Sequence, residues 1–243
     1  MRYYIGTSGW HYNHWREKFY PKRLAKSRWL EFYSEKFSTV ELNNSFYRLP
    51  SERAFTNWRD SSPIEFIFSV KVSRYITHIK RLKNTAEPIS NFMARARLLD
   101  DKLGPLLYQL PKNMKRDSLM LEEFLKTLPE NSCNVVEFRH NSWFDAEIFE
   151  ILRHYNAGFC IYDMPDFTTP VIATSNFAYV RFHGSRQLYG SCYSEKELED
   201  WAIKFKKLGV SNLYAYFNND AEGFATKNAL MFRHLLELPL SND

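Results

Sequence analysis

The sequence predicts a TIM-type (βα)8 barrel, an α/β fold with a barrel of parallel strands inside a ring of helices. Short apolar runs alternate with helical patterns along nearly the whole chain, which is typical of a parallel sheet. Eight strand candidates in 243 residues match one such barrel better than the competing architecture, an open doubly wound sheet. No linker or change of composition marks a boundary, so residues 1–243 are predicted to form a single barrel domain.

The eight predicted strands are apolar runs that end in polar side chains. They cover residues 3–6, 39–42, 66–70, 106–108, 134–136, 159–162, 178–180 and 213–217. The strands of such a barrel all end at one face, where its enzymes carry their reactive groups. The polar side chains that follow the runs are therefore expected to meet in one site.

Helical patterns fill the segments between these strands. The expected helices begin at Ser27, Ser51, Pro88, Asp117, Ser142 and Ser194 and near Glu222, and they end near residues 37, 59, 103, 128, 156, 209 and 238 respectively. Gly104-Pro105 is expected to stop the third helix, and residues 194–197 form a capping-box pattern. Residues 163–178 show no apolar stripe, so the sixth helix is predicted to be reduced or replaced by a loop.

Composition narrows the class of protein. Hydrophobic residues make up 44% of the chain, enough to bury a large core. The net charge of +5 favours anionic partners, but it is much lower than the positive charge of a dedicated nucleic-acid-binding arm. Cys133, Cys160 and Cys192 lack CxxC spacing, which fits a reducing compartment. With neither a signal-peptide pattern nor a run long enough to span a membrane, the chain is expected to be soluble and cytoplasmic, without a membrane partner.

Four side chains at predicted strand ends are candidates for proton transfer. They are Glu41, Glu137, Asp163 and His183. Residues two apart in a strand share a face, so Glu137 lies with Arg139, and His183 with Arg181. Two alternatives remain open: the carboxylates and guanidinium groups form a paired network that closes the barrel, and His183 is an ordinary structural residue.

A second set of side chains is expected to bind the substrate. Its members are Lys71, Arg139, Arg181, His78, Asn43, Gln109, Trp10, Tyr189, Asn218 and Asn219. Guanidinium groups suit bidentate binding of phosphate or carboxylate, and the long basic loop 72–87 after the third strand adds positive charge. The alternatives are a solvated basic loop, an aromatic plug around Trp10, and a simple turn at residues 218–220.

No cofactor is predicted. The four proton-transfer candidates could meet around a divalent metal, but Lys71, Arg139 and Arg181 would already neutralise the carboxylates. The chain also lacks the HExxH, EF-hand, GxSxG, P-loop and GxGxxG patterns.

Several motifs in combination resemble the YecE-like family, domain of unknown function 72. They lie at residues 6–10 with Trp15, 19–21, 40–47, 68–71 with 77–78, 106–111, 137–140 with 142–143, 179–184 and 216–220, nearly the whole chain. The resemblance implies a TIM-type barrel, and it implies no particular reaction or catalytic residue.

The main functional hypothesis is an enzyme that acts by acid/base chemistry on an anionic small molecule, phosphorylated or carboxylated, at the carboxyl end of the barrel. Hydrolysis, isomerisation and lyase chemistry all remain open. The alternatives are a protein that binds or processes nucleic acid and a barrel that binds a ligand without catalysis.

Overall fold

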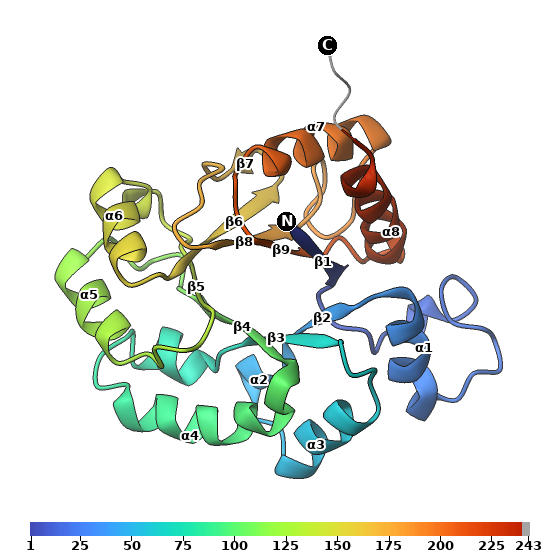
Figure 1. The fold of residues 1–243 in the computed structure, drawn as a ribbon, viewed down its shortest axis with the longest axis horizontal. Coiled ribbons are helices and arrows are strands. Elements are labelled where there is room, and N and C mark those ends of the chain that lie inside the picture. The colour runs from blue at the N-terminus through green and yellow to red at the C-terminus, as the bar shows by residue number, and fades with distance from the viewer. Residues whose placement is uncertain (240–243) are drawn as a thin grey trace.

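The computed structural model describes residues 1–239, and these residues form the predicted barrel (Figure 1). The parallel strands lie side by side in the order β1-β9-β8-β6-β5-β4-β3-β2. Their bounds are Arg2–Thr7 (β1), Thr39–Leu42 (β2), Ile67–Lys71 (β3), Leu103–Gln109 (β4), Asn134–Glu137 (β5), Gly158–Met164 (β6), Phe177–Phe182 (β8) and Asn212–Phe217 (β9). All eight runs chosen from the sequence are strands, with shifts of a few residues at the ends.

The barrel is nearly closed between β1 and β2. These two strands share one parallel bridge, from Ser8 to Glu41, in place of a full ladder. The close approach depends on Gly6, because a Cβ there would lie 2.2 Å from the carbonyl oxygen of Thr39. We call this contact between β1 and β2 the seam. It places Ser8 and Glu41, from opposite ends of the sheet order, next to each other.

Helices surround the strands on the outside of the barrel (Figure 1). They are α1 (Trp29–Lys36), α2 (Asn44–Tyr47), α3 (Glu52–Asp60), α4 (Ala86–Ala96), α5 (Ser118–Lys126), α6 (Ala146–His154), α7 (Glu195–Lys206) and α8 (Phe224–Glu237). Shorter helical turns cover Asn13–Trp15, Lys26–Arg28, Tyr75–Ile79, Arg97–Lys102 and Asn141–Trp143. Across residues 1–239, no helix combines the length and apolar character that a membrane crossing requires.

The connection between β6 and β8 contains no helix, as the sequence predicts. Its only regular element is β7 (Phe167–Thr168), which pairs antiparallel with the end of β6. Thr169 and Thr174 fasten the rest of this connection by accepting hydrogen bonds from the backbone N–H groups of Tyr162 and Phe159. Two side-chain hydroxyls thus attach this connection to β6, at the place in the chain where a sixth helix would otherwise lie.

Helix starts agree with the sequence where the capping side chain is unambiguous. Ser51 and Asp117 accept hydrogen bonds at the starts of α3 and α5, and Ser194 with Glu197 forms the capping box of α7. Two expected starts are wrong. Asp145, not Ser142, caps α6, and the turn at Lys26–Arg28 precedes α1, so Ser27 is no cap.

The predicted end of the helix before β4 is also wrong. The α-helix ends at Ala96, and a 3-10 turn follows it. Gly104 and Pro105 lie inside β4, where the side chain of Ile67 leaves no room for a Cβ at position 104. These two residues serve close strand packing and do not terminate the helix.

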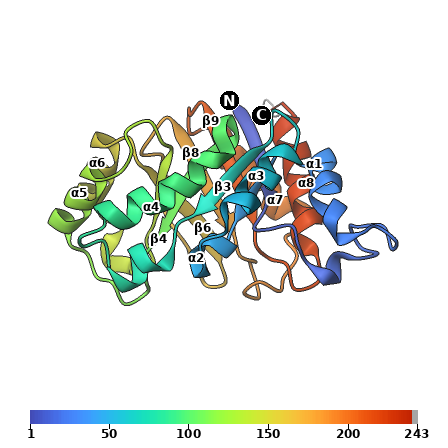
Figure 2. The same ribbon diagram turned by 90° about the horizontal axis from the view of Figure 1, so that it is seen from below.

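The strand ends that carry the predicted polar groups share one face of the barrel. In Figure 2 the N-terminus, where β1 begins, is at the top, and α2, which follows β2, is at the lower edge. Apolar side chains fill the layer between strands and helices. A smaller cluster fills the barrel interior; it contains Leu107, Val135, Cys160, Phe177, Tyr179, Tyr214 and Tyr216.

Candidate functional site

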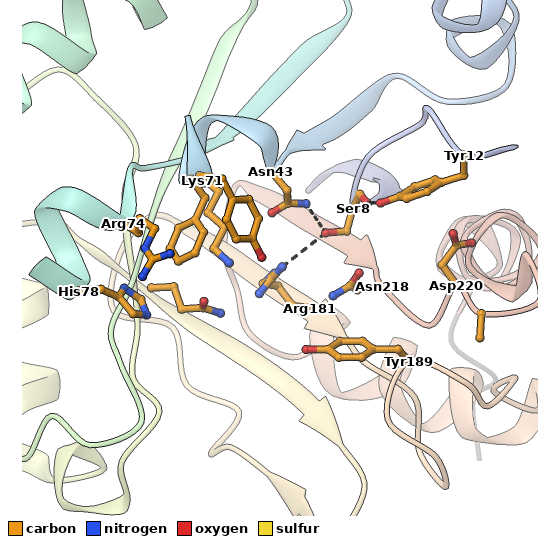
Figure 3. Close-up of a pocket in the computed structure, with 14 residues that line it drawn as sticks. Ser8, Tyr12, Asn43, Lys71, Arg74, His78, Arg181, Tyr189, Asn218 and Asp220 are labelled. Atoms are coloured by element: carbon orange, nitrogen blue, oxygen red, sulfur yellow. Dashed lines mark hydrogen bonds between the residues drawn. The ribbon is translucent and has the colours of Figure 1, made fainter. Parts of the chain in front are cut away.

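A pocket of about 720 Å³ opens at the carboxyl ends of the strands (Figure 3). It is lined by Ser8, Tyr12, Asn43, Phe46, Tyr47, Lys71, Arg74, His78, Gln109, Arg181, Tyr189, Asn218, Asp220 and Ala221. Seven residues expected to bind substrate are among them: Asn43, Lys71, His78, Gln109, Arg181, Tyr189 and Asn218. The structure therefore brings together side chains that lie far apart in the sequence.

The floor of this pocket is a buried ion network centred on Arg181. One terminal nitrogen of its guanidinium donates to Glu41 at 2.9 Å, and the other donates to Glu137, also at 2.9 Å. Arg139 donates to the same Glu137 carboxylate. All four side chains are at most 9% exposed, so water does little to screen the network. We call Glu41, Glu137, Arg139 and Arg181 the charged floor.

Each carboxylate of the charged floor also has neutral donors. Ser8 Oγ and Tyr179 Oη donate to Glu41 at 2.5 and 2.6 Å, and Gln109 Nε2 donates to Glu137 at 2.7 Å. Burial alone would raise the pKa of both carboxyls, but the guanidinium groups and these donors outweigh it and lower the pKa below the ordinary value. Both groups therefore stay ionised and balance the charge of the two arginines. Their lone pairs already accept hydrogen bonds, so neither carboxylate is a good proton acceptor for a substrate.

His183 lies beneath the pocket and is fully buried. Its Nε2 lies 3.2 Å from an Arg139 nitrogen and its Nδ1 lies 3.1 Å from the Asn218 amide nitrogen. Both neighbours are donors, and a neutral imidazole can accept from only one of them. Burial, Arg181 and Arg139 hold the pKa of His183 well below its usual range. This neutral ring positions Arg139 and Asn218, an arrangement that favours the structural alternative for His183.

Lys71 is the buried cation of the pocket that lacks a counter-ion. The residue is 9% exposed, and its ammonium lies 4.1 Å from the centre of the Phe46 ring. Within residues 1–239 it has no carboxylate within 4 Å. Burial and the nearby Arg181 lower the pKa of Lys71 to about 8, although Glu137 and Glu41 act in the opposite direction.

The mouth of the pocket carries further polar and aromatic groups. His78 lies with its ring 5.1 Å from that of Phe46, and burial together with Lys71 and Arg74 lowers its pKa. Tyr189 packs edge-on against the buried His183 ring and is itself 44% exposed. Arg74 is exposed at the rim.

Three of the expected site residues lie elsewhere. Asp163 faces away from the charged floor, and its carboxylate accepts hydrogen bonds from Thr168 and Tyr193. Asn219 is buried and donates to Ser191 and Asn228. Trp10 lines a neighbouring cavity, where its ring meets Trp58 edge-on at 5.7 Å.

Several residues of the site are absent from the set expected from the sequence. Ser8, Tyr12, Phe46, Tyr47, Arg74, Asp220 and Ala221 line the pocket, and Tyr179 and Cys160 contact the charged floor from below. Ser8 follows β1 directly, a signal that could have identified it, and Arg74 belongs to the basic loop after the third strand that the sequence already indicates as a source of positive charge. Tyr179 lies two residues before Arg181 in β8, so the alternation of side chains in a strand could have placed it under Glu41.

A divalent metal fits this site poorly. Two of the four sequence candidates, Glu41 and Glu137, are engaged by guanidinium groups, and Asp163 faces elsewhere. In the described part of the chain, no group of three or more His, Cys, Asp or Glu side chains is arranged to hold a metal ion.

Similar proteins share this architecture along the whole chain. The crystal structure of a DUF72 family protein from Thermotoga maritima MSB8 superposes with a TM-score of 0.89 at 33% identity, covering 98% of this chain and 100% of that one. A DUF72 family protein from Enterococcus faecalis V583 has a TM-score of 0.84 at 20% identity over 98% and 97% of the two chains, which supports the fold alone.

Sequence comparison gives the same relationship. The chain is 28% identical to the UPF0759 protein YunF of Bacillus subtilis (strain 168), covering 98% of this chain and 96% of YunF. It is 30% identical to the UPF0759 protein YecE of Escherichia coli (strain K12) over 58% of this chain and 50% of YecE. The family described as "Protein of unknown function DUF72" matches residues 4–242. The chain therefore belongs to the DUF72 family.

Proposed function

We propose that this protein is an enzyme that binds an anionic small molecule, phosphorylated or carboxylated, in the pocket and transforms it by acid/base chemistry. The observation that carries the proposal is the uncompensated positive charge of the pocket. Within the charged floor, two guanidinium groups balance two carboxylates. Lys71 and Arg74 add positive charge and, among residues 1–239, form no ion pair.

The one acidic side chain of the lining does not cancel this excess. Asp220 accepts hydrogen bonds from the Trp15 indole at 2.6 Å and from His14 at 2.9 Å, both away from Lys71. A phosphate or carboxylate that enters the pocket therefore meets Lys71 and Arg74 as its natural counter-ions.

The groups that suit proton transfer are Lys71 and His78. Both line the pocket; the pKa of about 8 lets Lys71 exchange a proton near neutral pH, and the lowered pKa of His78 favours a neutral ring that can accept one. Glu41 and Glu137, which the sequence suggests as acids or bases, serve in this proposal as fixed counter-ions. His183 is fully buried against Arg139 and Asn218 and serves in this proposal as a structural residue.

The test is a thermal-shift titration of the full chain with inorganic phosphate and with matched phosphorylated, carboxylated and neutral small molecules. The anionic compounds should raise the melting temperature, whereas their neutral analogues should not. Arg74→Gln should weaken phosphate binding by roughly 10-fold, because a charge-assisted hydrogen bond is lost. Arg53→Gln, an equal loss of charge on the exposed surface of α3, should bind as the wild type does. Equal shifts with anionic and neutral compounds would refute the proposal.

Exposed aromatic residues at and near the pocket favour nucleic acid as a second candidate ligand. Tyr47, which lines the pocket, is 74% exposed. Tyr75, which lines a separate cavity, is 49% exposed, and the Lys80 ammonium lies 5.7 Å from its ring centre. Interleaved basic and aromatic side chains can stack bases and hold phosphates. This candidate requires affinity for a single-stranded oligonucleotide that falls steeply with added salt and with Tyr47→Ala. Salt-insensitive binding would exclude it.

A further inference from the structure

We propose that Lys71 is a nucleophilic amine that forms an imine with an aldehyde or ketone carrying a phosphate or carboxylate group. This inference rests on the proposed function, since it uses the same pocket and assigns a carbonyl group to its anionic substrate. It makes Lys71 a covalent catalyst in addition to a source of charge.

The position of the side chain suits a nucleophile. Lys71 is the last residue of β3, and its backbone carbonyl accepts a hydrogen bond from Ser45 Oγ at 2.7 Å, which fixes the base of the side chain. From there the side chain extends into the pocket between His78 and Arg181 (Figure 3). The contact of its nitrogen is the Phe46 ring face, so no hydrogen bond to a carboxylate holds the nitrogen lone pair or its proton.

The electrostatic surroundings make the neutral amine available. Burial and Arg181 disfavour the ammonium form, and the attraction of Glu137 and Glu41 is reduced because each carboxylate is already paired with a guanidinium. The contact with Phe46 favours the ammonium form, but it is a weaker effect, typically about 0.5–2 kcal/mol. With a pKa of about 8, roughly half of the Lys71 side chains are neutral at pH 8. A lysine in water, with a pKa near 10.4, is neutral in under about 1% of molecules at that pH.

The reaction needs no oxidant or external reductant. The Lys71 nitrogen forms a bond to the carbonyl carbon, and the carbonyl π pair moves to oxygen. The nitrogen loses a proton and the oxygen gains one, which gives a carbinolamine. A second proton, taken from solvent, converts this hydroxyl into water. Water leaves as the nitrogen lone pair forms the C=N bond, so one carbonyl, one amine and one proton give one iminium ion and one water molecule.

The test is reductive trapping of the full-length protein with sodium borohydride, whose hydride reduces the iminium to a stable secondary amine. Dihydroxyacetone phosphate and pyruvate are the anionic probes, and dihydroxyacetone is the neutral control. Peptide mass spectrometry should find one adduct per chain, at Lys71, and at least 10-fold less adduct with the neutral control. The extent of trapping at a fixed short time should rise with pH and reach half its maximum near pH 8. Adducts spread over the surface lysines, or equal labelling by charged and neutral probes, would overturn the proposal.

Two variants separate this inference from the proposed function. Lys71→Arg keeps the positive charge but cannot form the imine, so it should lose the adduct while phosphate still raises its melting temperature. Lys83→Arg, at an exposed position in the segment that follows β3, should be trapped like the wild type. If phosphate stabilises the wild type and no Lys71 adduct forms, the covalent step is wrong and the anion site stands. If phosphate does not stabilise the wild type, the proposed function itself fails.

Discussion

Arg181 holds the two carboxylates of the charged floor at a fixed separation. Its terminal nitrogens reach Glu41 on β2 and Glu137 on β5, while Arg181 itself comes from β8. A buried pair of this kind is weak evidence for high stability, because desolvating the charges offsets most of their attraction. Losing one partner is costly, since it leaves a buried charge unbalanced.

We expect Glu137→Gln to lower the free energy of unfolding by roughly 3–5 kcal/mol, because Arg139 would lose the carboxylate it pairs with and Arg181 would lose one of its two. Urea denaturation at pH 7 measures this loss. Glu147→Gln, which breaks an ion pair with the partly exposed Arg116, serves as the control and should change stability little. Equal losses in the two variants would show that the buried network does not hold the strands together.

At the residue scale, the sequence predicts which side chains meet better than it predicts what they do. The two-residue alternation correctly places Glu137 with Arg139 and foresees a paired network as one interpretation. Both carboxylates also accept hydrogen bonds from Ser8, Tyr179 or Gln109, which lie on other strands or loops. No local sequence pattern predicts these contacts. Asp163 could have been placed correctly, because it alternates with Tyr162, whose ring faces the Arg139 guanidinium at 4.5 Å.

At the scale of elements, the approach of β1 to β2 decides the shape of the site. Gly6 allows this approach, and the Tyr33 hydroxyl supports it by donating to Thr39 O and accepting from the Thr7 N–H, each at 3.0 Å. The seam would open if either strand moved outward, and Ser8 would then leave Glu41.

Gly6→Ala should therefore destabilise the protein by at least about 1–3 kcal/mol, because the new methyl group overlaps backbone atoms that cannot rotate away. It should also weaken phosphate binding, since Ser8 and Asn43 line the pocket at this seam. Urea denaturation and the phosphate titration measure the two effects. The control is Ser211→Ala, at an exposed position just before β9. A Gly6→Ala variant as stable as this control would contradict the role of the close approach.

Element boundaries show where local signals suffice. Caps at Ser51, Asp117 and Ser194 are readable because each is followed by a clear apolar stripe. Ser142 and Asp145 are both good capping residues three positions apart, and the choice of Asp145 depends on Trp143, which is buried and donates to the carbonyl of Met114. Gly104-Pro105 mimics a helix stop, and only the proximity of Ile67 across the strand pair shows its actual role. Tertiary packing decides these cases.

At the scale of the whole molecule, the charged floor couples stability to pH. Glu41 and Glu137 have lowered pKa values in the folded protein, so they stabilise the fold above the unfolded value of about 4.3. This stabilisation is lost progressively as the pH falls below about 4.3, because the unfolded chain then binds more protons than the folded one.

The urea midpoint of the wild type should therefore decrease on acidification below about pH 4.3, and more steeply than that of Glu137→Gln, which lacks one of the two responsible carboxyls. Denaturation curves measured at several pH values between roughly 3 and 7 test this difference. Parallel pH dependences in the two proteins would show that Glu137 does not contribute to the acid transition.

The neutrality of the charged floor has a consequence for altering this protein. Because its four side chains cancel one another, the preference of the cavity for a ligand is set by the other lining residues, chiefly Lys71 inside the cavity and Arg74, His78 and Tyr47 around its opening. The three positions around the opening lie on the segment that follows β3 or on the short helix α2, and none of them is fully buried. The selectivity of the cavity for its ligand can thus be changed by substitutions there, while the charged floor stays unchanged.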